Sequence, residues 1–256
     1  MPIKSFNLMS RSATTIMRLG VGAFAFVVLL VPVIVHPRAT DPRPAIRILF
    51  IGNSFTDFND LPRMVAELAE AGGQRPLHYE KETPDGYTLE KHWQDRKALS
   101  RIRSGHWDFV VLQDQSAAPL LRRNAMVEYG KKFDAEIKKQ RAKTILYETW
   151  ALQNKPEQQT AISNAYGGLS RELKARLAPV GTAWQMALRS DTTLILHDMD
   201  HKHPNATGTY LAACVFYATI FDKSPEGLPG QIGGLTNREA QRLQSIAWKS
   251  VQAAGK

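Results

Sequence analysis

Short apolar runs rich in β-branched residues alternate with longer amphipathic stretches along most of this chain. This alternation constrains the fold most strongly, because it is typical of a parallel sheet whose strands are connected by helices. We expect one three-layer α/β/α domain with a mainly parallel, about five-stranded sheet. The expected strands cover residues 46–52, 77–83, 108–113, 143–150 and 193–198, and the expected helices cover residues 60–72, 88–103, 122–140, 157–177, 182–190, 206–222 and 236–253. Thr236 and Glu239 form a capping-box pattern at the start of the last helix.

The beginning of the chain differs in composition from the rest. Residues 19–35 are uncharged and almost wholly apolar, and the preceding stretch carries three basic residues and no acidic one. This pattern predicts a signal peptide or signal anchor over residues 1–40, followed by the folded domain over residues 41–256. The following segment, VHPRATDP, offers no good cleavage site, which favours an uncleaved anchor. We therefore expect the domain to lie outside the cytoplasm, as a periplasmic, membrane-anchored or secreted protein.

Charge and cysteine content exclude other classes of protein. The chain has 33 Lys and Arg residues against 24 Asp and Glu residues, and these charges form no dense basic block. We therefore expect no nucleic-acid partner. The single cysteine, Cys214, cannot form an internal disulfide or a cysteine-based zinc site, and it lies in an apolar run where we expect it to be buried.

Ser54 directly follows the first apolar run, in the sequence IGNSFTDFND. In an open α/β sheet, ligands bind beyond the carboxyl ends of the strands, so a serine hydroxyl at this position can serve as a nucleophile. Taken alone, the position favours a simpler interpretation, in which Ser54 or Asp57 caps the helix that follows, as such residues do in most loops between a strand and a helix. The surrounding sequence is neither a G-x-S-x-G elbow nor a phosphate-binding loop.

A second group of chemically active side chains lies before the long apolar helix expected at residues 206–222. Pro204 favours an extended or turn conformation for the residue before it. In a D-x-x-H pair on such a bend, the carboxylate can accept a hydrogen bond from imidazole Nδ1 and leave Nε2 free to take a proton from serine. The group consists of His197, Asp198, Asp200, His201 and His203.

Two D-x-x-H pairs overlap in this group. We favour Asp200 with His203 over Asp198 with His201, because His203 directly precedes Pro204 and the helix start. A zinc or manganese site is the alternative, but the sequence lacks the H-x-x-x-H and H-E-x-x-H spacings of helical metal sites.

These two motifs together resemble those of the SGNH hydrolases, also called GDSL-like esterases and lipases, over about residues 46–222. The resemblance implies a flavodoxin-like variant of the α/β/α fold. It also implies that Ser54 is the nucleophile, His203 the base and Asp200 the acid that orients the base.

The resemblance further implies an oxyanion hole. Ser54 contributes to it, and Gly86, in TPDGYTLEKHW, matches the family's glycine after the second strand. Gln115 stands where the family has the asparagine of G-x-N-D, and it carries the same amide donor on one more methylene. Gln113 is the reserve candidate for this third donor.

We therefore expect a serine ester hydrolase, without cofactor or metal, that removes short O-acyl groups such as acetyl from glycans or other small esters outside the cytoplasm. An O-acyltransferase acting on envelope glycans and a catalytically silent glycan-binding protein are the alternatives. Membrane contact is expected only through the N-terminal segment, and the oligomeric state is not predicted. His92 is expected to be a surface or packing residue, and Trp150 a packing residue that can line the mouth of a site.

Overall fold

The structure is a computed structural model that describes residues 44–255. The leader expected over residues 1–40 lies outside the described residues. Among the helices of residues 44–255, none combines the length and apolar character needed to span a bilayer.

The described part of the chain contains a central sheet of five parallel strands in the order β2-β1-β3-β4-β5. Strand β1 comes first, β2 pairs with it on one side, and the chain then continues through β3 on the other. The strand order therefore reverses between β1 and β3, which is where ligands bind in sheets of this kind. The strands are β1 (Ile46–Ile51), β2 (Leu77–Glu82), β3 (Phe109–Leu112), β4 (Lys143–Tyr147) and β5 (Arg176–Ala178).

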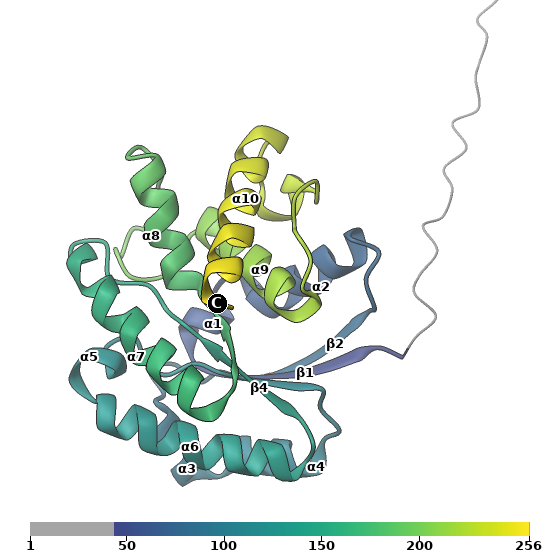
Figure 1. Cartoon of the computed structure of the whole chain (residues 1–256), viewed down its shortest axis with the longest axis vertical. Helices are drawn as coiled ribbons and strands as arrows, with labels where there is room; N and C mark the ends of the chain where they lie inside the picture. Colours follow the sequence, from purple (N-terminus) through teal and green to yellow (C-terminus); the bar gives the residue numbers. More distant parts are fainter. Residues whose placement is uncertain (1–43, 256) are drawn as a thin grey trace, which may run out of the picture. The chain divides into compact units, whose positions relative to one another are not determined.

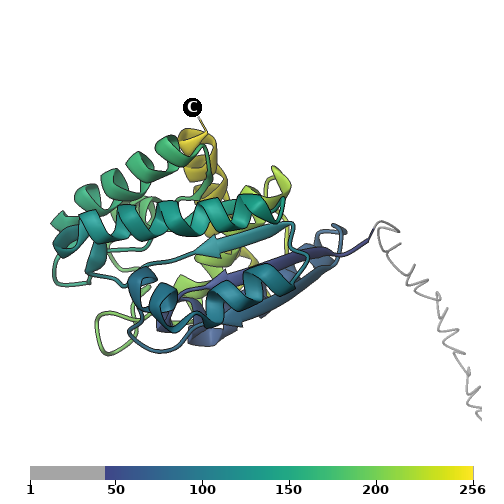
Figure 2. The same cartoon turned by 90° about the horizontal axis from the view of Figure 1, so that it is seen from below.

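Helices cover both faces of the sheet and make the three-layer arrangement visible in Figure 1. Helices α6 and α7 lie side by side in both views (Figure 1, Figure 2). One face is covered by α2 (Leu61–Ala71), α8 (Val180–Ser190), α9 (Ala206–Phe221) and α10 (Asn237–Ala254), and the other by α3 (Leu89–Asp95), α4 (Lys97–Ser104), α6 (Arg123–Lys139) and α7 (Gln159–Leu173). Two short helices, α1 (Ser54–Asp57) and α5 (Ala118–Leu121), and three 3-10 turns, at Phe58–Asp60, Pro156–Gln158 and Gly230–Gly233, complete the described structure.

Strand β1 shows how the sequence divides the core into two halves. Ile48 and Phe50 pack on the side of α2 and α9, and Leu49 and Ile51 pack on the side of α3 and α4. Successive side chains of a strand point to opposite faces, and a strand covered on both faces needs a continuous apolar run. The expected α/β/α architecture and the burial of Cys214 in α9 are confirmed.

The prediction of the fifth strand was wrong. Residues 193–198 form only an isolated bridge, between His197 and Pro204, and Ile195 is 61% exposed. The segment bonds to its own returning chain, where Asn205 N–H donates to the Leu196 carbonyl at 2.9 Å. The true fifth strand is β5, a three-residue segment that the sequence pattern assigned to the end of a helix.

The helix expected over residues 88–103 is two helices. Arg96 separates α3 from α4 with a φ of 63°, in the left-handed region, which breaks the helical hydrogen-bond ladder. The capping box of Thr236 and Glu239 at the start of α10 is confirmed.

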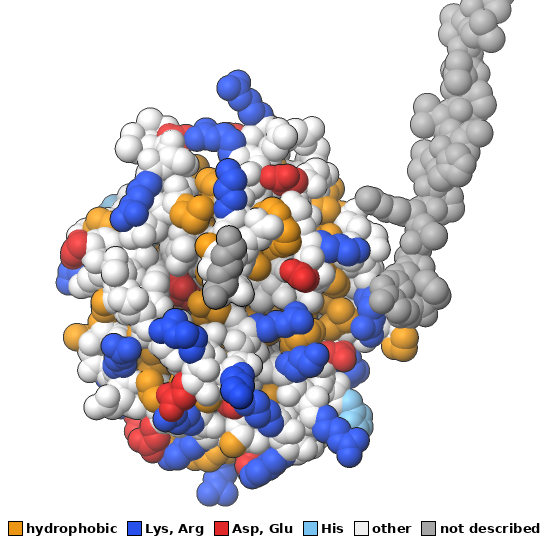
Figure 3. Space-filling model, in the orientation of Figure 1, with side chains coloured by type: hydrophobic (Ala, Val, Ile, Leu, Met, Phe, Trp, Pro, Cys, Tyr) orange, Lys and Arg blue, Asp and Glu red, His pale blue; other side chains and the backbone are white. Residues whose placement is uncertain are grey.

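On the displayed face, Lys and Arg side chains are spread among acidic ones rather than gathered in one block (Figure 3).

Candidate active site

The Ser54 loop (residues 52–57) carries the serine from the end of β1 into α1. Ser54 is the first residue of this four-residue helix and is 9% exposed. The side chain of Asn53 caps the helix, because its Oδ1 accepts a hydrogen bond from Phe55 N–H at 3.1 Å. The helix cap therefore falls to Asn53, which leaves the Ser54 hydroxyl free for another partner.

Gln113, the residue after β3, fixes the Ser54 loop from the neighbouring strand. Its Oε1 accepts hydrogen bonds from Asn53 N–H and Thr56 Oγ1, both at 2.9 Å, and its Nε2 donates to Asn53 Oδ1 at 2.9 Å. All these groups are buried. The side chain thus extends the sheet by one residue beyond the last ladder bond between β1 and β3.

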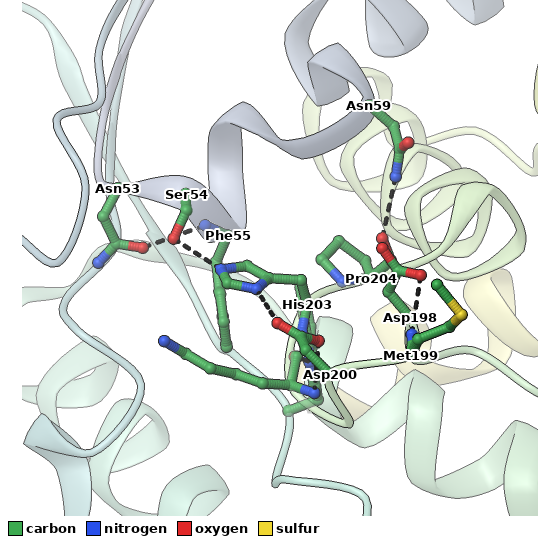
Figure 4. Close-up of polar contacts among 11 residues, drawn as sticks. Asn53, Ser54, Phe55, Asn59, Asp198, Met199, Asp200, His203 and Pro204 are labelled. Carbon is green, nitrogen blue, oxygen red and sulfur yellow. Dashed lines mark hydrogen bonds and ion pairs between the residues drawn. The ribbon is translucent and has the colours of Figure 1, made fainter.

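The imidazole of His203 contacts Ser54, although the two residues lie 149 positions apart in the chain. His203 Nε2 lies 2.9 Å from Ser54 Oγ, and His203 Nδ1 lies 2.5 Å from Asp200 Oδ2. Figure 4 shows the three side chains in one row. An ionised carboxylate can only accept, so Asp200 places the imidazole proton on Nδ1 and leaves the Nε2 lone pair facing the serine hydroxyl.

The Asp200 carboxylate is held by its own turn. Its Oδ1 accepts hydrogen bonds from Lys202 N–H at 3.0 Å and from His203 N–H at 2.9 Å. Desolvation alone would raise its pKa, but the hydrogen bonds from His203 and Lys202 outweigh this effect and lower the pKa to about 2. Asp200 is therefore ionised at neutral pH, and the 48% exposure of its side chain also favours the charged form.

Aromatic rings enclose the imidazole. The ring of Phe58 stacks on that of His203 with centroids 4.2 Å apart and an interplanar angle of 9°. Phe55 approaches it edge-on at 5.6 Å. The His203 side chain is consequently only 15% exposed, and its orientation is fixed by packing as well as by hydrogen bonds.

Asn59 connects the chain after Ser54 to the His203 loop (residues 197–204). Its Nδ2 donates to the Pro204 carbonyl at 3.0 Å (Figure 4). The same nitrogen donates to Thr209 Oγ1 at 2.9 Å. Asn59 has a φ of 52°, a conformation that asparagine tolerates better than most residues. These two hydrogen bonds join the chain just after Ser54 to the end of the His203 loop and to the first turn of α9.

The remaining members of the His/Asp group have other partners. Asp198 Oδ1 accepts from Met199 N–H within its own turn, and His201 Nδ1 contacts Gln153 Oε1 at 2.8 Å. His197 is buried, with Nε2 3.0 Å from the Ala151 carbonyl. The structure thus brings together the Asp200 and His203 pair favoured from the sequence. Residues 44–255 contain no group of three His, Cys, Asp or Glu side chains placed to hold a metal ion.

The Ser54 loop and the loop after β2 are joined by a hydrogen bond from Asn53 Nδ2 to the Tyr87 carbonyl at 2.9 Å, and each presents one backbone N–H that is free to donate. Ser54 N–H and Gly86 N–H bond to no other described residue. Gly86 is exposed and has a φ of 65°, and the turn that contains it is closed by a hydrogen bond from Tyr87 N–H to the Pro84 carbonyl at 3.3 Å.

Gln115, the expected third oxyanion donor, has other hydrogen-bond partners in the structure. Gln115 Nε2 donates to Ser116 Oγ at 3.1 Å, and its Oε1 accepts from Ala117 N–H at 2.8 Å, so the side chain folds into its own turn. Gln113 cannot substitute, because its amide donates to Asn53 Oδ1 and to the Asp114 carbonyl. The sequence pattern predicts Gln113 only as a reserve donor and gives no sign that its side chain positions the Ser54 loop.

The chain was compared with protein families, curated proteins and solved structures. No protein-family model and no curated protein matches the chain. A proposed SGNH hydrolase from Slackia heliotrinireducens is 26% identical, with a TM-score of 0.59, and the match covers 69% of this chain and 99% of that one. A DUF4886 family protein from Bacteroides uniformis is 19% identical, with coverage of 83% and 96% and a TM-score of 0.66. An acetyl xylan esterase is 16% identical, with coverage of 68% and 100% and a TM-score of 0.57.

Proposed function

We propose that this chain, which belongs to the SGNH or GDSL-like hydrolases, cleaves O-acyl esters through a covalent acyl intermediate on Ser54. The observation that carries the proposal is the hydrogen-bonded row from Ser54 Oγ through the His203 imidazole to Asp200. A nucleophile, a base and a residue that orients the base are the groups that acyl transfer requires.

In the first half of the reaction, His203 Nε2 takes the proton of Ser54 Oγ as this oxygen attacks the carbonyl carbon of the ester. The carbonyl electron pair moves to its oxygen, and Ser54 N–H and Gly86 N–H donate to the resulting oxyanion. When the tetrahedral intermediate collapses, the bond to the alcohol oxygen breaks and His203 gives its proton to that oxygen. The alcohol leaves, and the acyl group stays on Ser54.

In the second half, His203 takes a proton from water, whose oxygen attacks the acyl carbon. The bond to Ser54 Oγ then breaks, and the serine regains its proton from the imidazole. Asp200 stabilises the imidazolium in both halves and keeps the neutral ring in the Nδ1–H tautomer. The carboxylate stays ionised throughout this cycle, because its pKa of about 2 lies far below neutral pH.

We propose a short acyl group, such as acetyl, and a glycan or another small alcohol as the substrate class. A neighbour in fold is an acetyl xylan esterase, which supports this choice. An apolar cavity of about 410 Å³ between the loop after β4 and helix α8 is lined by neither Ser54 nor His203. That cavity therefore does not offer the serine a tunnel for a long acyl chain.

We also propose that the reaction takes place outside the cytoplasm. The support is the sequence of the leader, with its basic stretch followed by the apolar residues 19–35. Cell fractionation with an antibody against the chain tests the location, and protease accessibility in intact spheroplasts shows on which side of the membrane residues 41–256 lie. Recovery of the chain in the cytosolic fraction would contradict this part of the proposal.

The activity is tested with the full chain, a short-chain aryl acetate and a serine-reactive aryl phosphonate. We expect release of free acetate, and mass spectrometry should locate the phosphonate adduct on Ser54. Ser54→Ala should lose the adduct and roughly 10⁴- to 10⁶-fold in kcat. Ser190→Ala, which removes a serine hydroxyl at the end of α8, serves as the matched control and should be unaffected.

Other outcomes separate the alternatives. Transfer of acetyl to an added sugar in preference to water would identify an acyltransferase. Sugar binding without turnover in the wild-type protein would identify a binding protein. Loss of activity with a chelator but not with the phosphonate would identify a metal enzyme and would contradict the role of Ser54.

A further inference from the structure

His92 is a buried histidine outside the row formed by Ser54, His203 and Asp200. It lies one turn into α3, whose first turn is capped by the side chain of Thr88, and it is 0% exposed. Its Nε2 lies 2.7 Å from the carbonyl oxygen of Gly52. The sequence pattern predicts a surface or packing residue, and the structure gives this side chain a specific hydrogen-bond partner in the Ser54 loop.

The second ring nitrogen of His92 has no partner among the described residues. A carbonyl can only accept, so Nε2 carries the proton and the lone pair of Nδ1 lies at a buried position without a partner among the described residues. Burial lowers the pKa of His92, which keeps the ring neutral. A buried acceptor without a partner costs folding free energy, and leucine would avoid that cost. The hydrogen bond to Gly52 is therefore what the histidine contributes at this position.

Gly52 is a point at which several constraints on the Ser54 loop meet. Its N–H donates to the Glu82 carbonyl at 3.1 Å, at the end of β2. A Cβ atom on Gly52 would lie 2.4 Å from Gln113 Oε1, so the close approach of β3 requires glycine here. The His92 ring fixes the carbonyl of the same residue, two positions before Ser54.

His92 also contacts the loop that carries Gly86. The ring of Tyr87, the residue after Gly86, packs edge-on against the His92 ring with centroids 5.0 Å apart. The Tyr87 carbonyl accepts a hydrogen bond from Asn53 Nδ2 at 2.9 Å. One imidazole therefore contacts both loops that present a free backbone N–H, one loop through a hydrogen bond and the other through ring packing.

We infer that His92 is a positioning residue that sets the spacing between Ser54 N–H and Gly86 N–H, the two backbone donors of the oxyanion hole. This inference rests on the proposed function, because it assigns His92 a part in stabilising the tetrahedral oxyanion. Donors of this kind act only if they are aimed at the oxyanion before the reaction begins. His92 itself touches neither substrate nor the reacting atoms.

The test compares two substitutions at this position in the full chain. His92→Leu removes the donor and keeps an apolar side chain, whereas His92→Gln keeps an amide N–H near the position of Nε2. Deleting one oxyanion donor costs about 10²- to 10³-fold in kcat, and a misplaced pair should cost less. We expect His92→Leu to lower kcat about 10- to 100-fold with KM within about threefold, and His92→Gln to recover kcat to within about fivefold of wild type.

The rate of inactivation by the aryl phosphonate gives a second measurement, because its tetrahedral adduct uses the same donors. That rate should fall in parallel with kcat in His92→Leu. Ile102→Ala is the matched control, since it removes a buried side chain of the neighbouring helix α4 and leaves every hydrogen bond of the two loops in place. Active protein is counted by phosphonate titration at the end of the reaction, so partial unfolding does not count as a slower reaction.

The outcomes distinguish this inference from the proposed function. A wild-type protein without esterase activity or a phosphonate adduct would contradict the proposed function. Active wild type together with a His92→Leu variant of unchanged kcat would overturn the inference alone. A His92→Gln variant as slow as His92→Leu, or an Ile102→Ala variant with the same loss of kcat, would also overturn it.

Discussion

The Ser54 loop and the His203 loop meet at one site, but they are fixed in different ways. The Ser54 loop is bonded to neighbouring strands and helices through buried groups, chiefly Gln113 and His92. In the His203 loop, the carboxylate of Asp200 is half exposed and accepts from residues two and three positions along the same turn. The first loop is part of the core, and the second is a locally built turn.

This difference allows effects on stability to be separated from effects on activity, although the two often change together. Breaking a buried hydrogen bond leaves an unpaired group and costs about 1–3 kcal/mol, whereas exposed ion pairs contribute roughly 0–1 kcal/mol. We therefore expect substitutions around Ser54 to lower both stability and activity. Substitutions in the Asp200 turn should lower activity with little change in stability.

The largest effect is expected for His203→Gln. Without the base, kcat should fall roughly 10⁴-fold or more, because Ser54 loses its proton acceptor. The free energy of unfolding should change by about 1 kcal/mol or less, since the lost contacts are mainly the stacked Phe58 ring and two side-chain hydrogen bonds. Steady-state kinetics and urea unfolding measure the two quantities. A loss of stability as large as that of a core substitution would contradict the comparison.

Asp200→Asn should lower kcat roughly 10⁴-fold at pH 7, because the amide no longer fixes the Nδ1–H tautomer. The native pKa of Asp200 is lowered to about 2, below its value in the unfolded chain. Its carboxylate therefore contributes stability above the unfolded pKa of about 3.9, and this contribution is lost as the pH falls toward 2. Urea unfolding at pH 7, 4 and 2 should show a small wild-type advantage that disappears at the lowest pH. An advantage that grows on acidification would contradict the assignment.

Gln113→Ala tests the core-bonded loop. It removes an acceptor from Asn53 N–H and Thr56 Oγ1 and a donor to Asn53 Oδ1, all buried. We expect the free energy of unfolding to fall by about 2–4 kcal/mol and kcat to fall about tenfold. Gln113→Glu is the conservative control, which keeps both acceptor contacts and loses the donor. A fully active, stable alanine variant would show that the Ser54 loop needs no support from β3.

Asn59→Gly gives the smallest expected effect and probes the contact between the two loops. Glycine keeps the left-handed backbone but loses the hydrogen bonds to Pro204 and Thr209. We expect a loss of about 1–2 kcal/mol in unfolding free energy and of two- to fivefold in kcat. Asn59→Ala should be less stable than the glycine variant, because it adds strain at a positive φ. Equal stability of the two variants would argue against that strain.

Much of the fold could be predicted because its signals are local. Apolar runs and amphipathic periods placed β1 to β4 and most helices within a few residues. The fifth strand could not be placed this way, because β5 has only three residues, while residues 194–197 are apolar for another reason. Only Leu196 and His197 of this segment are buried, against Trp184 and α9, and this is a tertiary effect that a local pattern does not reveal.

In the candidate site, too, local motifs could be predicted and contacts between distant residues could not. Ser54, Asp200 and His203 stand in short motifs, and the structure brings these three side chains together. Their catalytic roles and the third oxyanion donor stay predictions. The contacts of His92 with Gly52 and of Gln113 with Asn53 join residues 40 and 60 positions apart. Sequence spacing alone gives no sign of such pairs.

The hydrogen bond between Ser54 and His203 spans 149 positions of the chain. Contacts so distant in sequence form late, because the loop they close must first lose much of its conformational entropy. Catalytic competence should consequently arise in the final phase of refolding, after helix α9 has docked against the sheet. During refolding, ester cleavage should therefore return later than the helical circular dichroism signal, and its return would report that assembly of the fold is complete.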